Sequence, residues 1–351
     1  MAGLAMEWTL VALQGVLLLA GLAAFLSVLR RVGLTSVYGH LFFTNCLGLW
    51  VLFVAFLVLN YHGLVLGSDR TVLHVGHFVK LLAYLFIALS FIMLASHFES
   101  GGPQSVRRLR GWLLLTPAVG AWALGVYILS PLKADAWHMM QLAYLTLGGI
   151  GIGAVLYCFI VLAHLGNSLL ARFYLLFGAT VILNAVADFG AVHFAMQGHI
   201  APNLAVETLY ALAGVMLVGS AIYHARALAV LGKATEDLTL TPYEALGLTT
   251  EEKVLSAYVH LHRTLLGAAA HAQLQAAAWD AARDLRKPVR VEEVPGPRTR
   301  PGLTTNLSPE DFRHLLRGLR DRYHRLAGGN SAALGHRVAL AYGREFEFLA
   351  R

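Results

Sequence analysis

Four side chains that can carry charge or share protons follow one face of an apolar segment. His74, His77, Lys80 and Tyr84 recur every three or four residues in "VLHVGHFVKLLAYLFIALS". At 100° per residue they fall within an arc of roughly 120° on a helix, so the spacing predicts one polar stripe. Ionisable groups are costly in hydrocarbon unless they are paired, hydrated or used. The stripe therefore predicts either a charge pair or a binding site.

A second stripe and a third acid offer partners for this lysine. Thr180, Asn184 and Asp188 recur at every fourth residue of another apolar run, and Glu207 and Tyr210 begin the next one. We expect Lys80, Asp188 and Glu207 to converge, with His74 or His77 beside them. The predicted ligand-binding residues are His74, His77, Lys80, Tyr84, Asn184, Asp188, Glu207 and Tyr210.

The elements that must position these residues are membrane helices. The chain has 351 residues, of which 57% are hydrophobic and 13% charged, and its mean hydropathy is +0.62. This composition excludes a soluble globular domain. A bilayer core needs about 20 apolar residues per helix, and seven runs meet that length: 8–29, 41–60, 72–95, 111–132, 139–163, 173–194 and 204–223. The sequence predicts an all-α integral membrane protein built on a seven-transmembrane-helix bundle.

Basic clusters predict the orientation of this bundle. They follow run one (Arg30, Arg31), precede run four (Arg107, Arg108, Arg110), precede run six (Arg172) and follow run seven (Arg226, Lys233). With seven spans all four clusters share one side, which the positive-inside rule assigns to the cytoplasm. We expect the N-terminus outside, in a multi-pass protein of the cytoplasmic (inner) membrane. At 1.5 Å per residue, Lys80, Asp188 and Glu207 then lie ~12, ~10 and ~5 Å below the outer helix ends.

The chain changes character after the seventh run. We place the transmembrane domain at 1–230 and a small, mainly helical cytoplasmic C-terminal module at 231–351, with a Pro/Gly-rich linker near 287–306. "LTTEE" and "LSPED" each offer a hydroxyl N-cap with an acid three residues later, and Pro309 suits a first helical position. "VRVEEV" could form a short strand, and the segment after it, 295–306, is expected to be irregular.

Several chemistries are compatible with the stripes. A pair of Lys80 with Asp188 or Glu207 could simply hold helices together, as most interhelical polar contacts do. Alternatively, these residues could line a polar pocket that is open to the outside. His74, His77 and His193 are the candidate metal ligands, and the cofactor is otherwise unknown. Haem needs two facing histidines, and the available pairs are His77 with His193, and His97 with His164 or His224. Lys80 is not expected to hold retinal, because run seven contains no lysine.

One stretch resembles a known family. "HVGHFVKLLAYLFIA" is similar to the His-x-x-Lys-Leu-Leu segment of prokaryotic seven-helix membrane-associated sensor domains, such as those at the front of some histidine kinases. The resemblance at motif level is limited to His77–Leu82, and the remainder is shared topology. It implies a sensor domain. Those sensors normally feed an enzymatic module, whereas no nucleotide loop or catalytic motif occurs after residue 230. This chain would then signal through a partner.

The sequence thus favours a non-enzymatic receptor or signal transducer that senses a small ligand, ion or proton. Its expected partners are the lipid bilayer and a cytoplasmic signalling protein, and a homo-oligomer is compatible with the sequence. The basic residues before residue 230 sit mainly in orientation clusters, so the charge of +7 does not indicate nucleic acid. The alternatives are a haem- or metal-binding oxidoreductase subunit and a small-solute transporter. In a transporter, Pro117 and "GGIGIG" at 148–153 would be local helix breaks.

Overall fold

The structure, a computed structural model, describes most of the chain. The described residues are 2–64, 75–98, 104–130, 133, 135–163, 168–197, 203–233, 248–294, 300–303 and 307–351. Contacts divide it into two compact units. The first comprises Met1–Val28, Leu41–Ala163 and Phe173–Tyr223, and the second comprises Leu29–His40, His164–Arg172 and His224–Arg351. The second unit therefore joins the C-terminal helices to two short segments from much earlier in the chain.

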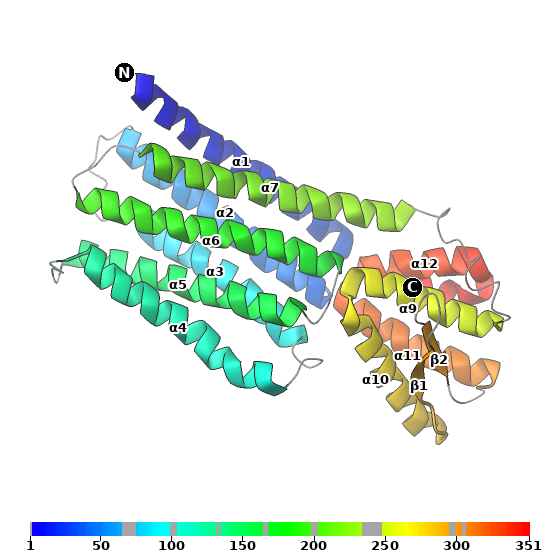
Figure 1. Cartoon of the computed structure of the whole chain (residues 1–351). Coiled ribbons are helices and arrows are strands. Elements are labelled where there is room, and N and C mark those ends of the chain that lie inside the picture. Colours follow the sequence, from blue (N-terminus) through cyan, green and yellow to red (C-terminus); the bar gives the residue numbers. More distant parts are fainter. Residues whose placement is uncertain are drawn as a thin grey trace. The chain divides into compact units, whose positions relative to one another are not determined.

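Seven long helices follow one another from the N-terminus (Figure 1). They are α1 (Ala2–Val32), α2 (Val37–Leu64), α3 (Val75–Phe98), α4 (Gln104–Ile128), α5 (Ala136–Ala163), α6 (Leu169–Met196) and α7 (Leu204–Lys233). Each is long and apolar enough to cross a membrane. The seven predicted spans are confirmed as helices, although residues 72–74 of the third and 131–132 of the fourth lie outside the described residues, and α4 already ends at Ile128.

Small residues bring α4 and α5 into close contact. A Cβ at Gly149 or Gly153 of α5 would collide with the α4 backbone at Pro117 and Leu113, so these glycines permit the approach. Both α4 and α5 continue unbroken through Pro117 and through 148–153. The expectation of local breaks is wrong. The glycines permit close packing, and the Leu113 carbonyl, which receives no hydrogen bond from Pro117 because proline has no N–H, lies against α5.

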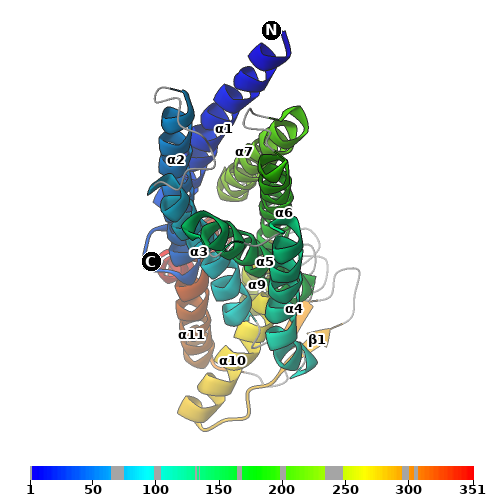
Figure 2. The ribbon, with the colours of Figure 1, turned by 90° about the vertical axis from the view of Figure 1, so that its left-hand side faces the viewer.

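Helix α4 lies at the edge of the first unit. Only 11% of its most apolar window is buried, against at least 33% in every other spanning helix, and Figure 2 shows it beside α5 and away from α1 and α2. The interior holds an aromatic cluster of Phe25, Phe42, Phe91, Phe173 and Phe177, with neighbouring ring centroids 5.1–5.6 Å apart. These rings join α1, α2, α3 and α6.

The C-terminal part of the second unit is mainly helical, as predicted. It contains α9 (Thr250–Leu266), α10 (Ala268–Leu285), β1 (Val291–Val294), β2 (Arg300–Leu303), α11 (Pro309–Ala327), α12 (Gly329–Tyr342) and the 3-10 helix η2 (Arg344–Ala350). Both predicted helix starts are confirmed. Thr249 forms a complete capping box with Glu252. Ser308, the residue before Pro309, accepts a hydrogen bond with its hydroxyl from the backbone amide of Asp311.

The linker contains more regular structure than its composition suggests. The predicted strand at 291–294 is confirmed, and it pairs antiparallel with β2 from Val291–Leu303 to Val294–Arg300. The expectation that 300–303 is irregular is wrong. Both strands of a two-stranded sheet are edge strands, so each has one side without a hydrogen-bonded neighbour. A strand of this kind tolerates a residue without an N–H, such as Pro301 in β2. Residues 295–299 and 304–306 lie outside the described residues.

Within the second unit, the α11–α12 junction packs on the end of α1. Gly328 adopts φ +54°, and a Cβ there would meet the Val32 carbonyl oxygen and the Ser36 side chain. A Cβ at Gly329 would meet the Arg31 carbonyl oxygen. Glycine is therefore required twice over at residue 328, once for its conformation and once for space.

We expect Gly328→Ala and Gly318→Ala to change stability in opposite directions. Gly318 lies inside α11 with open space around it, so alanine there should stabilise the protein by roughly 0.5–1 kcal/mol. Alanine at 328 should destabilise it by at least that much. Thermal unfolding of the purified full-length variants measures both. Equal effects at the two positions would show that the close approach to α1 is not made.

A buried histidine lies at the centre of the C-terminal helices. The His262 ring stacks on Tyr323 with centroids 3.9 Å apart. Its Nδ1 donates to the Tyr258 carbonyl at 2.9 Å, because a carbonyl can only accept, and Nε2 then accepts from the Ser331 hydroxyl at 2.9 Å. Burial lowers the pKa of His262 from 6.5 to about 3. The neutral ring is therefore part of the folded core.

The stability of this core should fall in mild acid. The unfolded chain takes up a proton near pH 6.5 and the folded one only near pH 3, so stability is full above 6.5 and decreases as the pH drops between these values, by about 1.4 kcal/mol per pH unit. His262→Gln keeps a donor and an acceptor but cannot titrate. Thermal unfolding at pH 7.5 and 5.5 should show a smaller acid loss in this variant. Parallel losses in both proteins would contradict the assignment.

Candidate functional site

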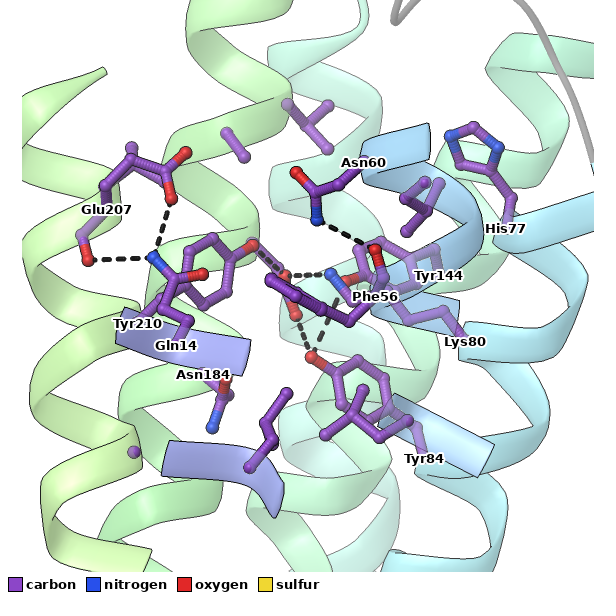
Figure 3. A pocket seen from close by; sticks show the side chains of 18 of the residues that line it. Gln14, Phe56, Asn60, His77, Lys80, Tyr84, Tyr144, Asn184, Glu207 and Tyr210 are labelled. Atoms are coloured by element: carbon purple, nitrogen blue, oxygen red, sulfur yellow. Dashed lines mark hydrogen bonds and ion pairs between the residues drawn. The ribbon is translucent and has the colours of Figure 1, made fainter. Parts of the chain in front are cut away.

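A cavity of about 260 Å³ lies inside the first unit (Figure 3). Its lining residues come from α1, α2, α3, α5, α6 and α7, and none of the described lining residues comes from α4. The wall is mostly apolar, with Leu18, Leu52, Phe177 and Leu217 among its residues. A concave, largely apolar pocket with a few converging polar groups is the usual form of a small-molecule site.

The predicted ion pair is present in this cavity. Lys80 Nζ on α3 lies 2.9 Å from Asp188 Oδ1 on α6, and the two side chains are 18% and 4% exposed. The hydroxyls of Tyr84 and Tyr210 also donate to the Asp188 carboxylate. Asp188 thus ties together α3, α6 and α7, and it is compensated by one cation and two neutral donors.

Three tyrosine rings surround the lysine ammonium. Lys80 Nζ lies 4.7 Å from the ring centroid of Tyr144, 5.3 Å from that of Tyr210 and 5.9 Å from that of Tyr84. The Tyr144 hydroxyl also donates to that of Tyr84 over 3.5 Å. Cation–π contacts at these distances stabilise a partly desolvated ammonium. The lysine is therefore held by a carboxylate and by aromatic faces together.

Glu207 lines the same cavity but is held by a different partner. The amide nitrogen of Gln14 on α1 donates to the Glu207 carboxylate over 2.7 Å and to its carbonyl oxygen over 3.2 Å. Convergence of Lys80, Asp188 and Glu207 in one pocket is confirmed, and it is Asp188 that takes the ammonium. The other predicted pocket residues, His77, Tyr84, Asn184 and Tyr210, also line the cavity. Whether they bind a ligand remains a prediction.

Histidines contribute less to this pocket than the sequence allowed. His74 lies outside the described residues, and the exposed His193 ring lies 3.0 Å from the Gln197 amide. The described residues contain no group of three or more His, Cys, Asp or Glu side chains that could hold a metal ion. Of the second set of haem candidates, His97 is exposed, His164 lies outside the described residues, and His224 shares a hydrogen bond with Tyr38.

Sequence reasoning missed three polar side chains that matter here. Gln14 is the most polar residue of run 8–29 and could have been noticed as such. Tyr144 carries no comparable signal, because tyrosine is common near helix ends in membranes, and Asn60 stands at the very end of the predicted run 41–60. All three line the cavity.

Comparison with known proteins adds no relative to this picture. No family model, no curated protein and no solved structure matches the chain.

The double variant Lys80→Met with Asp188→Asn should be more stable than Asp188→Asn alone. The single change leaves an ammonium buried without its counter-charge, which typically costs about 3–5 kcal/mol. The double change removes that charge. Tyr84 and Tyr210 donate to different carboxylate oxygens of Asp188, so the asparagine oxygen accepts from one of them and the amide nitrogen donates to the hydroxyl of the other. Thermal unfolding in detergent compares wild type, both singles and the double. Additive losses would mean that the two residues do not interact.

Proposed function

We propose that this chain is a seven-helix membrane receptor or signal transducer without an enzymatic activity of its own. It binds a small ligand in the cavity around Lys80 and Asp188 and signals through its C-terminal helices. The observation that carries this proposal is the cavity itself, in which six apolar helices enclose an ion pair, a further acid and three tyrosines. Ionisable residues inside a membrane bundle are costly to bury, which makes them the first candidates for a functional site.

Helix α7 is the element that would carry the signal. Glu207 and Tyr210 near its start line the cavity, and the same helix runs on to Lys233. Its later residues belong to the second unit, where His224 Nε2 lies 2.5 Å from the Tyr38 hydroxyl and the Ala225 carbonyl accepts from Arg31 over 3.3 Å. One continuous helix therefore has polar contacts at both ends.

The segment that α7 contacts also meets the C-terminal helices. Residues 29–40 hold Arg31, Val32 and Ser36, against which Gly328 and Gly329 pack. A shift or rotation of α7 would change the Tyr38 and Arg31 contacts and hence this packing. Small helix shifts of this kind are a common form of transmembrane switching.

The remaining features of the proposal rest on the sequence. The basic clusters favour a cytoplasmic C-terminal unit and an outside N-terminus in a prokaryotic inner membrane. The absence of catalytic motifs after residue 230 favours a separate cytoplasmic signalling partner, in keeping with the resemblance of His77–Leu82 to sensor domains.

Hydrogen exchange can test this coupling without a known ligand. Asp188→Asn perturbs the pocket, and a transducer should respond at 29–40, 224–229 and 324–332. We expect exchange rates there to change by roughly fivefold or more, the usual lower range of allosteric coupling. The measurement uses the full chain in lipid nanodiscs and mass spectrometry. A change confined to α3, α6 and α7 around the cavity would support a purely structural ion pair.

Two controls separate coupling from general loosening. Leu212→Ala alters an exposed side chain of α7 outside the cavity lining, and it should leave the three segments unchanged. The amides of α10 serve as an internal standard, since α10 does not include the proposed contacts. A uniform rise that includes α10 would indicate global destabilisation and count against the proposal.

A further inference from the structure

Three of the amide side chains that line the cavity have their nitrogens engaged in hydrogen bonds. Asn184 donates its nitrogen to the Thr180 carbonyl over 3.0 Å, and Asn60 donates to the Phe56 carbonyl over 2.8 Å. Gln14 donates to Glu207, and its oxygen end is turned away from that residue (Figure 3). A carbonyl can only accept, so each nitrogen is fixed opposite its partner. The remaining end of each amide is an acceptor.

The charges of the lining residues add to a negative sum. Counted as an ammonium and two carboxylates, Lys80 contributes +1 and Asp188 and Glu207 contribute −1 each, so the formal total of these three groups is 1 − 2 = −1. In a water-poor cavity this excess acts over short distances with little screening. An anion would be repelled, or would have to displace Asp188 from a lysine that three tyrosine rings also hold. A ligand that brings one positive charge makes the cavity neutral.

The cavity already accommodates one ammonium group. Lys80 Nζ sits on the faces of Tyr84, Tyr144 and Tyr210. Figure 3 shows Gln14, Glu207 and Asn184 on the other side of the pocket from Lys80 and His77. That second side holds a carboxylate and amide groups, and the cavity wall includes apolar residues of α7 such as Val206 and Leu217. It suits a group with several N–H donors attached to an apolar body.

We propose that the ligand of this pocket is a small organic cation, a protonated amine with an apolar body. Its ammonium bonds to Glu207, Asn184 and Gln14, and its body contacts the apolar wall. This inference rests on the proposed ligand-binding function and names the class of ligand. A bare metal ion fits less well, because the described residues do not group three or more carboxylate, imidazole or thiolate ligands.

A matched series of three probes tests the class. 2-Phenylethylamine, 2-phenylethanol and 3-phenylpropionate share a phenyl body and differ in charge. With purified full-length protein in nanodiscs at pH 7, calorimetry should give a Kd for the amine at least about tenfold below that of the alcohol, since hydrogen bonds to charged groups are the stronger ones. The carboxylate should bind most weakly. Equal binding of amine and alcohol, tighter binding of the carboxylate, or no binding of the amine would overturn the inference.

Variants locate the binding and provide controls. Glu207→Gln keeps size and an acceptor but removes the charge, so the amine should bind roughly tenfold more weakly while the alcohol is unaffected. Asp321→Asn removes an acid of the second unit and should change neither. If Glu207→Gln does not fold, Asn184→Leu should weaken the amine in the same way. Amine binding that neither pocket variant alters would place it elsewhere and refute the inference.

The outcomes distinguish the ligand class from the receptor function. Tight binding of the carboxylate, lost in Lys80→Met, would reverse the class and leave a ligand pocket in place. Amine binding without any exchange response at 29–40 and 324–332 would keep the class and remove the transducer. The two proposals can therefore fail separately.

Discussion

The Asp188 carboxylate is the constraint around which the first unit is organised. A buried acid in an apolar bundle is tolerated only when its charge is compensated and its oxygens receive hydrogen bonds. Here the compensation comes from Lys80 on α3, Tyr84 on the same helix and Tyr210 on α7. These contacts fix three helices against one another. The six helices that enclose the group must leave room for it, and α4, which contributes nothing to it among the described residues, remains peripheral.

Much of this arrangement could be predicted because charge and periodicity are strong signals in apolar sequence. Lys80 and Asp188 are conspicuous within their runs, and helical spacing places Tyr84 and Asn184 on the same faces. The helix starts at Thr249 and Ser308 were predictable for a similar reason, since a hydroxyl followed by an acid three residues later satisfies particular backbone amides.

The remainder could not be predicted because it depends on which helices are neighbours. Spacing within α1 does not reveal that Gln14 meets Glu207, 193 residues further along. Tyr144 acts through its ring, and an aromatic residue in a membrane helix is ordinarily an apolar one. Strand β2 was missed because Pro301 and Gly302 indicate a loop, whereas pairing with β1 overrides that local preference.

Two hydrogen bonds inside the cavity hold the start of α7 in its position, and a ligand could compete for them. The Tyr210 hydroxyl bonds to Asp188 on α6, while Glu207, one turn earlier, bonds to Gln14 on α1. A ligand that bonds to Glu207 must compete with Gln14 for that carboxylate. It can shift α7 from one position to another only if it binds more tightly to one of the two positions. In an apolar environment, a donor or acceptor that loses its partner costs free energy, because no water replaces that partner. If α7 moved, the bond between His224 and Tyr38 further along the helix would therefore be kept or lost as a whole, and would not weaken in proportion to the movement.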